Sequence, residues 1–558
     1  MNKLYTGAAG GWRGVIMAAA LGLATIFSGA QSPAPPPQSA PQVKPPDSGS
    51  GPSKDSPKSQ GKKPEKQITP EEAQELFALV DQLIKFSSEE TGLPIKSAVK
   101  RQLTTRTAVE SYLNEKFQED EGARRLQRGE IVLKKFGLLD RDFDLKPFLL
   151  SLLKEQIEAY YDSKSKTVNM LDWVDVDEQK PVLAHELTHA LQDQHVDLEK
   201  WGDQTPSDVS TNYHDDVDHL AKDEMDTARE AVAEGQATAV MMDNILKPMG
   251  KSLVKDPEVV EFIKNSMAGS ENSPILARAP LLLSESLLFP YREGLSFEQD
   301  LWIDRGQKAA FMDALDRPPT STWEIINPRE FERKKVPVVP LMPDIHPIVD
   351  QTYKPYDIGQ VGELDLNILT KLFGGDNAAR DLTPAWDGGI YWAGQRLSAK
   401  TPEEQASTKS ISLFYLSAWK SNASARAFST LYANALGRKY SGLHKDEAAA
   451  HTAPADAPEG TVEQVYTTNE GPVVITTRGR LVFVAESFDL DQARKLTTLI
   501  LDTQGTGDLK MARTVKPHAT TSSVAGPTLS AGLVHFFAEA GVMKSAVDAA
   551  IRVAASQH

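Results

Sequence analysis

One stretch of the chain decides which fold to expect: it reads HELTHALQDQH, from His185 to His195. It opens with the pattern HExxH, in which His185 and His189 stand four residues apart. At about 3.6 residues per helical turn, side chains four apart share one helix face. Two imidazoles on one rigid face can bind one ion, and zinc favours such nitrogen ligands. The spacing predicts a zinc-binding helix on which Glu186 can take a proton from water as general base.

The residues around this motif are apolar, which argues against a chance match on a solvated helix face. They are Val182, Leu183, Leu187, Ala190 and Leu191. Two histidines and a carboxylate on a buried helix need polar partners, and a metal ion is the simplest one. A hydrogen-bonded structural cluster without metal is the alternative.

A catalytic zinc site is expected to have a third protein ligand, and two candidates compete. His195 follows His185 by ten residues, which is the spacing of the third ligand in zincins with HExxHxxGxxH. In this chain, however, Gln192 stands where those zincins have the glycine that lets the chain turn. If the helix simply continues, ten residues rotate His195 by about 1000°, which is about 80° off the face of His185. We therefore expect a structural role for His195.

The second candidate lies on a helix expected over residues 225–246, where Glu230 and Glu234 are four apart and share a face. Here the chain resembles the gluzincin clan of metallopeptidases, which pair HExxH with a downstream helical glutamate. The run EGQA at 234–237 looks like the E-G-x-A around the third ligand in its aminopeptidase and collagenase branches. The resemblance implies Glu234 as metal ligand and Glu230 as its support.

The wider stretch is similar to a set of uncharacterised exported bacterial metallopeptidase-like proteins. The supporting blocks are AYYD at 159–162, HELTHALQDQH, AVAEGQA at 231–237, FPYREG at 289–294 and PPTSTWEIINP at 318–328. The resemblance covers roughly residues 155–330. It implies a zinc metallopeptidase that hydrolyses peptide bonds, with one Zn²⁺ held by His185, His189 and Glu234. An N-E-x-x-x-D arrangement after the second histidine, as in better-studied gluzincins, is absent.

Gluzincins often stabilise the oxyanion of the tetrahedral intermediate with a tyrosine or histidine from a later segment. The resemblance implies Tyr291 for this role, with His219 as a weaker candidate. Two other functions remain open: a catalytically inactive zincin-fold binding protein of the cell envelope, and a zinc hydrolase of a non-peptide amide there.

The N-terminal residues have the pattern of a secretory signal peptide over 1–30. Lys3 and Arg13 precede an apolar run at 15–27, which ends in small residues and is too short for a comfortable membrane span. We therefore expect export to the periplasm or the exterior of a bacterium, with an uncleaved anchor as the alternative. Residues 31–68 are rich in Pro, Ser and Lys and predict a disordered linker.

Charge and cysteine content exclude several classes of partner and chemistry. The net charge is −16, and −21 over residues 69–558, because the first 68 residues carry five more basic than acidic side chains. An acidic body disfavours nucleic acid and anionic membranes and leaves a peptide or protein as the expected substrate. The absence of cysteine excludes disulfides and a thiolate nucleophile. The oligomeric state is left open.

The rest of the pattern predicts an α+β chain. Residues 69–345 are expected to form a zincin-like domain, mostly helical with a small sheet, and 356–505 a second α+β domain. Residues 506–558 are expected to form a tail with one helix near 533–554.

Thr69, Pro70 and Glu72 fit the start of a first helix. We expect a strand at 95–103, a hairpin at 157–172 whose edge an extended peptide could pair with, an irregular stretch at 196–222 and a Pro-rich linker at 336–355. In the second domain we expect helices at 365–373, 424–435 and 490–501 and strands at 386–392, 411–416, 473–477 and 481–486.

Overall fold

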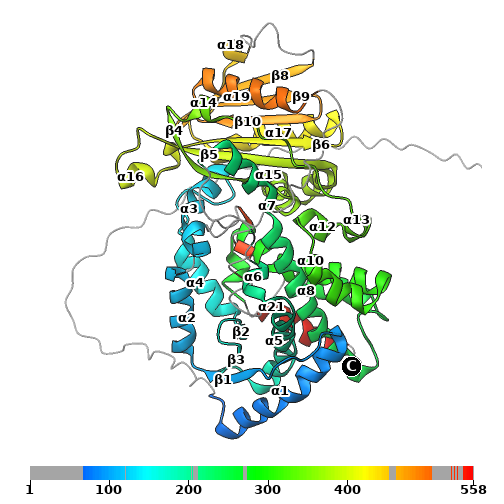
Figure 1. The fold of residues 1–558 in the computed structure, drawn as a ribbon. Coiled ribbons are helices and arrows are strands. Elements are labelled where there is room, and N and C mark those ends of the chain that lie inside the picture. Colours follow the sequence, from blue (N-terminus) through cyan, green and yellow to red (C-terminus); the bar gives the residue numbers. More distant parts are fainter. Residues whose placement is uncertain are drawn as a thin grey trace, which may run out of the picture. The chain divides into compact units, whose positions relative to one another are not determined.

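The computed structural model describes residues 67–119, 121–202, 204, 211–267, 273–450 and 460–505, and near the C-terminus 529–530, 533–534, 537 and 544–556. The predicted signal peptide lies outside these residues, as does the predicted linker up to residue 66. The described chain is α+β, as expected, with one small and one large sheet (Figure 1). None of its helices is both long and apolar enough to cross a membrane.

The small sheet has three strands in the order β1-β3-β2, which are Lys100–Thr104, Thr167–Leu171 and Ala159–Asp162. β2 and β3 pair antiparallel, so the predicted hairpin is confirmed, and β2 lies at one edge. The strand expected at 95–103 is wrong in its bounds. β1 begins only at Lys100, where parallel pairing with β3 begins at Thr167.

Helices make up most of the first half of the chain. They are α1 Pro70–Thr91, α2 Arg106–Glu119, α3 Glu121–Phe136, α4 Leu145–Gln156, α5 Val176–Val196, α6 Leu198–Gly202, α7 Tyr213–Lys222, α8 Met225–Leu246, η1 Lys247–Met249, α9 Glu258–Met267, η2 Leu276–Arg278, α10 Leu281–Arg305, η3 Lys308–Asp313, α11 Ala314–Asp316, α12 Thr322–Ile326 and α13 Pro328–Glu332. The predicted capping box of α1 is present, with Thr69 and Glu72 bonded reciprocally. The predicted bounds of α8 are confirmed.

The stretch expected to be irregular at 196–222 instead contains α6 and α7. α7 forms because the Asn212 side chain accepts hydrogen bonds from the backbone N–H of His214 and Asp215. α7 has few apolar residues, but its Asp216, His219 and Leu220 side chains are buried against neighbouring elements. A local cap and tertiary burial therefore make a helix where the polar composition suggested none.

The large sheet has the order β4-β5-β6-β10-β9-β8-β7, with every neighbouring pair antiparallel. Its strands are β4 Tyr353–Gln360, β5 Trp386–Arg396, β6 Ile411–Trp419, β7 His444–Lys445, β8 Thr461–Thr468, β9 Gly471–Arg478 and β10 Leu481–Glu486. Its helices are α14 His346–Val349, α15 Glu363–Leu382, η4 Thr383–Ala385, α16 Pro402–Gln405, η5 Thr408–Ser410, α17 Asn422–Lys439, α18 Glu447–Ala450 and α19 Leu490–Thr503. The predicted hairpin at 473–486 is confirmed as β9 and β10.

Both faces of this sheet are covered, which is why its central strands are buried along their whole length. On one face Phe414 and Phe483 pack in a cluster with Leu496 of α19. On the other face Tyr415 packs in a second cluster with Phe428 of α17. That second cluster also contains the core of the first half of the chain.

The prediction that residues 336–355 form a linker is wrong, because this segment is packed against the large sheet. Met342, Ile345 and Val349 are buried in the cluster beneath α19, and β4 begins at Tyr353. Near the C-terminus, α21 spans Lys544–Ser556, so it covers only the second half of the helix expected near 533–554. α21 packs against α9, and Lys544 pairs with Glu158 just before β2.

Candidate metal centre

The histidines of the motif lie in the middle of α5, which is capped at both ends. The Asp175 side chain accepts from the backbone N–H of Asp177 at the N-terminus, and Asp197 adopts a left-handed conformation at the C-terminus. Between the caps, α5 packs against α1 and α8 and buries Leu183, Leu187 and Leu191. The expected apolar helix around a polar trio is therefore present.

Glu234 comes from α8, which is buried over most of its length and packs closely against α10. The close packing requires two glycines. A Cβ on Gly294 would lie 2.1 Å from the carbonyl oxygen of Ala231, and a Cβ on Gly235 would lie 2.3 Å from the carbonyl oxygen of Gly294. The two backbones can touch only because neither residue has a side chain. This contact sets Glu234 of α8 close to Tyr291 of α10.

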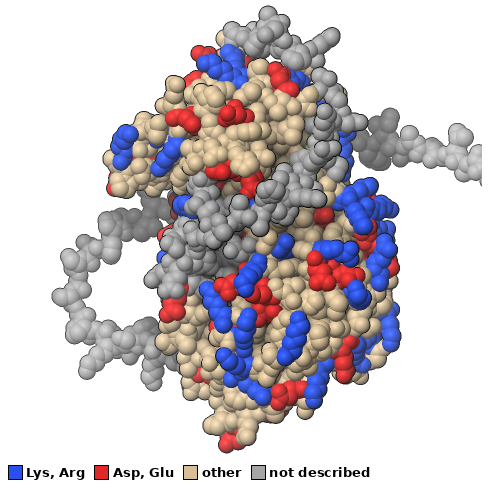
Figure 2. Space-filling model, viewed as in Figure 1, with Lys and Arg blue, Asp and Glu red and all other residues tan. Residues whose placement is uncertain are grey.

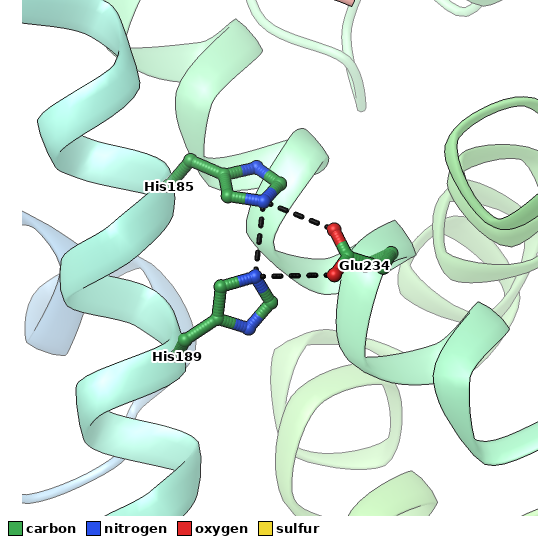
Figure 3. Close-up of side chains that lie close together, drawn as sticks. All are labelled: His185, His189 and Glu234. Atoms are coloured by element: carbon green, nitrogen blue, oxygen red, sulfur yellow. Dashed lines mark hydrogen bonds and ion pairs between the residues drawn. The ribbon is translucent and has the colours of Figure 1, made fainter. Parts of the chain in front are cut away.

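His185, His189 and Glu234 converge from these two helices (Figure 3). His185 Nε2 lies 3.0 Å from Glu234 Oε2 and 3.0 Å from His189 Nε2, and His189 Nε2 lies 3.5 Å from Glu234 Oε1. Ligands about 2.0–2.2 Å from zinc at tetrahedral angles would be roughly 3.3 Å apart. The separations, of which two reach different oxygens of Glu234, are close to this spacing. This buried group could therefore bind a metal ion.

Burial and mutual charge shift the pKa values of all three residues. Burial lowers the pKa of His185. Burial also opposes the charged forms of His189 and Glu234, but their attraction and hydrogen bonding outweigh it. The pKa of His189 rises to about 9 and that of Glu234 falls to about 2. The site therefore holds an ionised carboxylate, the form that ligates metals.

Glu186 and Tyr291 lie beside the trio, and both are fully buried. The charge of Glu186 contributes to raising the pKa values of both His189 and Tyr291, so Glu186 is within electrostatic range of both. The Tyr291 ring is nearly parallel to that of His185, at 23° with centroids 6.2 Å apart. Burial, the charges of Glu234 and Glu186 and a hydrogen bond to Glu234 raise the pKa of Tyr291. The Tyr291 hydroxyl therefore interacts with the carboxylate of Glu234, and its role as oxyanion donor stays a prediction.

On its other side, His189 contacts Gln192, which in turn contacts Gln236. The sequence motif predicted a role for neither glutamine. His189 Nδ1 lies 2.8 Å from Gln192 Oε1, and Gln192 Nε2 donates to Gln236 Oε1 at 2.9 Å. Both amides are fully buried. Spacing gave a signal only for Gln192, which follows His189 by three residues and so shares its helix face. Gln236 follows Glu234 by two residues, a spacing that does not place them on one face.

The remaining candidates lie away from the trio. His195 Nε2 is 2.9 Å from Asp316 Oδ1, which agrees with the structural role expected from its helical rotation. His219, on α7, is 3.4 Å from Asp223. Glu230 is one helical turn before Glu234, and its charge adds to the field that raises the pKa of Tyr291. Among the described residues, the one group of side chains that could hold a metal ion consists of His185, His189 and Glu234.

Comparison with known proteins identifies no relative of this chain. No protein-family model, curated protein or solved structure matches it.

Proposed function

We propose that this chain is an exported zinc-dependent metallopeptidase of gluzincin-like type. One observation carries the proposal: two histidines from α5 and a glutamate from α8 place their ligand atoms within 4.8 Å of one another in a buried site. Two imidazoles and one carboxylate are the protein ligands of catalytic zinc in the thermolysin-like pattern, which leaves a coordination position for water. Export rests on the N-terminal pattern alone.

Each side chain of the site has a separate role in the proposed hydrolysis. His185, His189 and Glu234 would hold a zinc ion, which would supply Lewis acidity to polarise a carbonyl group and to make a water molecule more acidic. Glu186, next to His185 in sequence and buried with it, accepts the proton of the attacking water and passes it to the leaving amine. Tyr291, whose hydroxyl interacts with Glu234, is the candidate to stabilise the oxyanion.

The expected substrate is a peptide or protein. β2 is an edge strand of the small sheet and packs against α5, the helix that carries the motif. An extended peptide that added to this edge would lie beside the metal-binding helix.

The test is metal analysis together with hydrolysis of a broad peptide library. Glu186→Gln should retain zinc and lower kcat by at least about 100-fold, because the amide cannot accept the water proton. Glu234→Gln should lose zinc, because the site loses its only ligand charge, whereas Glu230→Gln and His195→Ala should retain it. Zinc lost from His195→Ala but kept by Glu234→Gln would overturn the ligand assignment.

Two outcomes would favour the other functions. Stoichiometric zinc in the wild type without cleavage of any library peptide would favour a binding protein of the cell envelope. Cleavage of cell-wall amides, but not peptides, would favour a zinc hydrolase of a non-peptide amide. Turnover that survives Glu186→Gln would contradict the proposed general base in either enzyme.

A further inference from the structure

A hydrogen-bonded chain of side chains runs from His189 away from the metal centre. Gln192 Oε1 lies 2.8 Å from His189 Nδ1, while His189 Nε2 faces His185 and Glu234. The two ring nitrogens of His189 therefore have separate partners. Which nitrogen carries a proton depends on which way the amide of Gln192 points.

Backbone carbonyls settle the direction of that amide. Gln192 Nε2 lies 3.0 Å from the carbonyl oxygen of Ala233, and a carbonyl oxygen can only accept a hydrogen bond. The –NH₂ group of Gln192 must therefore face Ala233. Its oxygen is left to face His189, so His189 Nδ1 must be the donor.

A second amide gives the same direction independently. Gln236 Nε2 lies 2.9 Å from the carbonyl oxygen of Ala310 and 3.1 Å from that of Phe311, both in η3. Its oxygen therefore accepts from Gln192 Nε2, at 2.9 Å. Two independent sets of carbonyls thus fix the chain of donors from His189 to Gln192 to Gln236.

We propose that Gln192 is the positioning residue of the metal ligand His189, with Gln236 and the carbonyl oxygens of Ala233, Ala310 and Phe311 holding it in place. Gln192 accepts the proton on Nδ1 and so presents the lone pair of Nε2 to the ion. The inference rests on the proposed function only in taking His189 as a ligand. Full burial of both amides keeps water from competing for these hydrogen bonds.

The type of side chain has a chemical consequence. A carboxylate that accepts from a ligand histidine makes the imidazole more basic and adds a negative charge near the ion. Gln192 is neutral, so it orients His189 without this charge. Its donors also tie α5 to α8, and Gln236 in turn ties α8 to η3. The residue that orients one ligand is thus fixed to the helix that carries another.

The experiment measures zinc affinity by competition with a chromophoric chelator in three full-length variants. Gln192→Met keeps the size of the side chain but loses both the acceptor and the donors, and should weaken zinc binding by about 10- to 100-fold. Gln192→Glu keeps an acceptor for Nδ1–H and should bind zinc more tightly than Gln192→Met, even though it loses the donors. Gln179→Met is the matched control: Gln179 is an equally buried glutamine of α5, bonded to Leu171 and Val174, and its loss should leave zinc affinity unchanged.

Two results would overturn the inference. One is wild-type zinc affinity in folded Gln192→Met; the other is an equal loss in Gln192→Met and Gln192→Glu. A wild type that binds no zinc would instead defeat the proposed function, so the two failures are distinguishable.

If Gln192→Met does not fold, ¹⁵N-histidine NMR of the zinc-loaded wild type decides the question. The signal of His189 is identified by its loss in His189→Gln. A proton on its Nδ1 is expected, and a proton on Nε2 with coordination through Nδ1 would overturn the inference.

Discussion

At the residue scale, the metal centre depends on groups that are buried yet charged or polar. Burial alone would favour a neutral Glu234, but the two histidines hold its pKa at about 2. Tyr291 and Gln192 then add hydrogen bonds from opposite sides, one to the carboxylate and one to His189. These hydrogen bonds hold the three side chains that could bind a metal ion in place, which would lower the cost of ordering them on binding.

Tyr291→Phe tests the hydroxyl at this scale. Phenylalanine keeps the ring beside His185 but removes the hydrogen bond to Glu234, and a hydrogen bond to a charged group contributes about 1.5–3 kcal/mol. We expect zinc affinity to fall by at least about tenfold, measured by chelator competition. Unchanged zinc affinity with a large fall in kcat would instead assign the hydroxyl to oxyanion stabilisation.

At the element scale, the site depends on how closely α8 and α10 approach. Gly235 and Gly294 allow the backbones to touch, and Glu234 and Tyr291 are one and three residues from that contact. The sequence blocks AVAEGQA and FPYREG contain these two glycines, but only the crossing of the helices reveals which backbone each glycine faces. Local propensity would otherwise disfavour glycine within a helix.

Gly294→Ala should destabilise the protein and weaken its metal site together. The new Cβ would lie 2.1 Å from the backbone oxygen of Ala231, so the helices must separate. We expect a loss of about 1–3 kcal/mol in the free energy of unfolding, measured by urea denaturation, and weaker zinc binding. Gly129→Ala is the control: it lies in α3 with no atom within 4 Å of the added Cβ, and should raise stability by about 0.5–1 kcal/mol. Wild-type stability in Gly294→Ala would contradict the packing argument.

At the scale of the whole molecule, the large sheet is joined to the helices that build the site. Lys135 of α3 is fully buried and pairs with Glu470 at 2.8 Å, between β8 and β9. At the start of α8, Asp223 accepts from the backbone N–H of Gln360 in β4, and the carboxylate of Glu224 occupies the space where a Cβ of Gly362 would lie. The helix that carries Glu234 therefore begins at a junction with the sheet.

This junction makes stability depend on pH. Burial raises the pKa of Asp365 to about 7, and burial followed by the charge of Asp365 raises that of Glu224. Because these folded-state pKa values lie above the ordinary ones near 4, the stabilising effect of protonation is complete below about pH 4. The part that Asp365 contributes is lost as the pH rises through about 7.

Asp365→Asn should reduce the fall in unfolding free energy between pH 5 and pH 8. It should also lower stability overall, because Asp365 accepts from the backbone N–H of both Ser530 and Gly362. Urea denaturation at the two pH values measures both effects. Glu115→Gln, at an exposed position of α2, should keep the wild-type dependence. An unchanged pH dependence in Asp365→Asn would contradict the assignment.

The sequence by itself determined the features that depend on local patterns. Helical spacing predicted α5 and α8, capping residues predicted the start of α1, and alternation around turns predicted both hairpins. The same spacing, with the gluzincin resemblance, named His185, His189 and Glu234, whose ligand atoms lie together in the structure.

Only the tertiary structure decided what depends on contacts between distant segments. α7 and the packed segment before β4 form because neighbours bury them, and β1 begins where β3 offers a partner. Gln192 gains its role from Ala233 and Gln236 on another helix. Periodicity shows which residues share a face, but the partner of that face is set by the free energy of burying it against the rest of the chain.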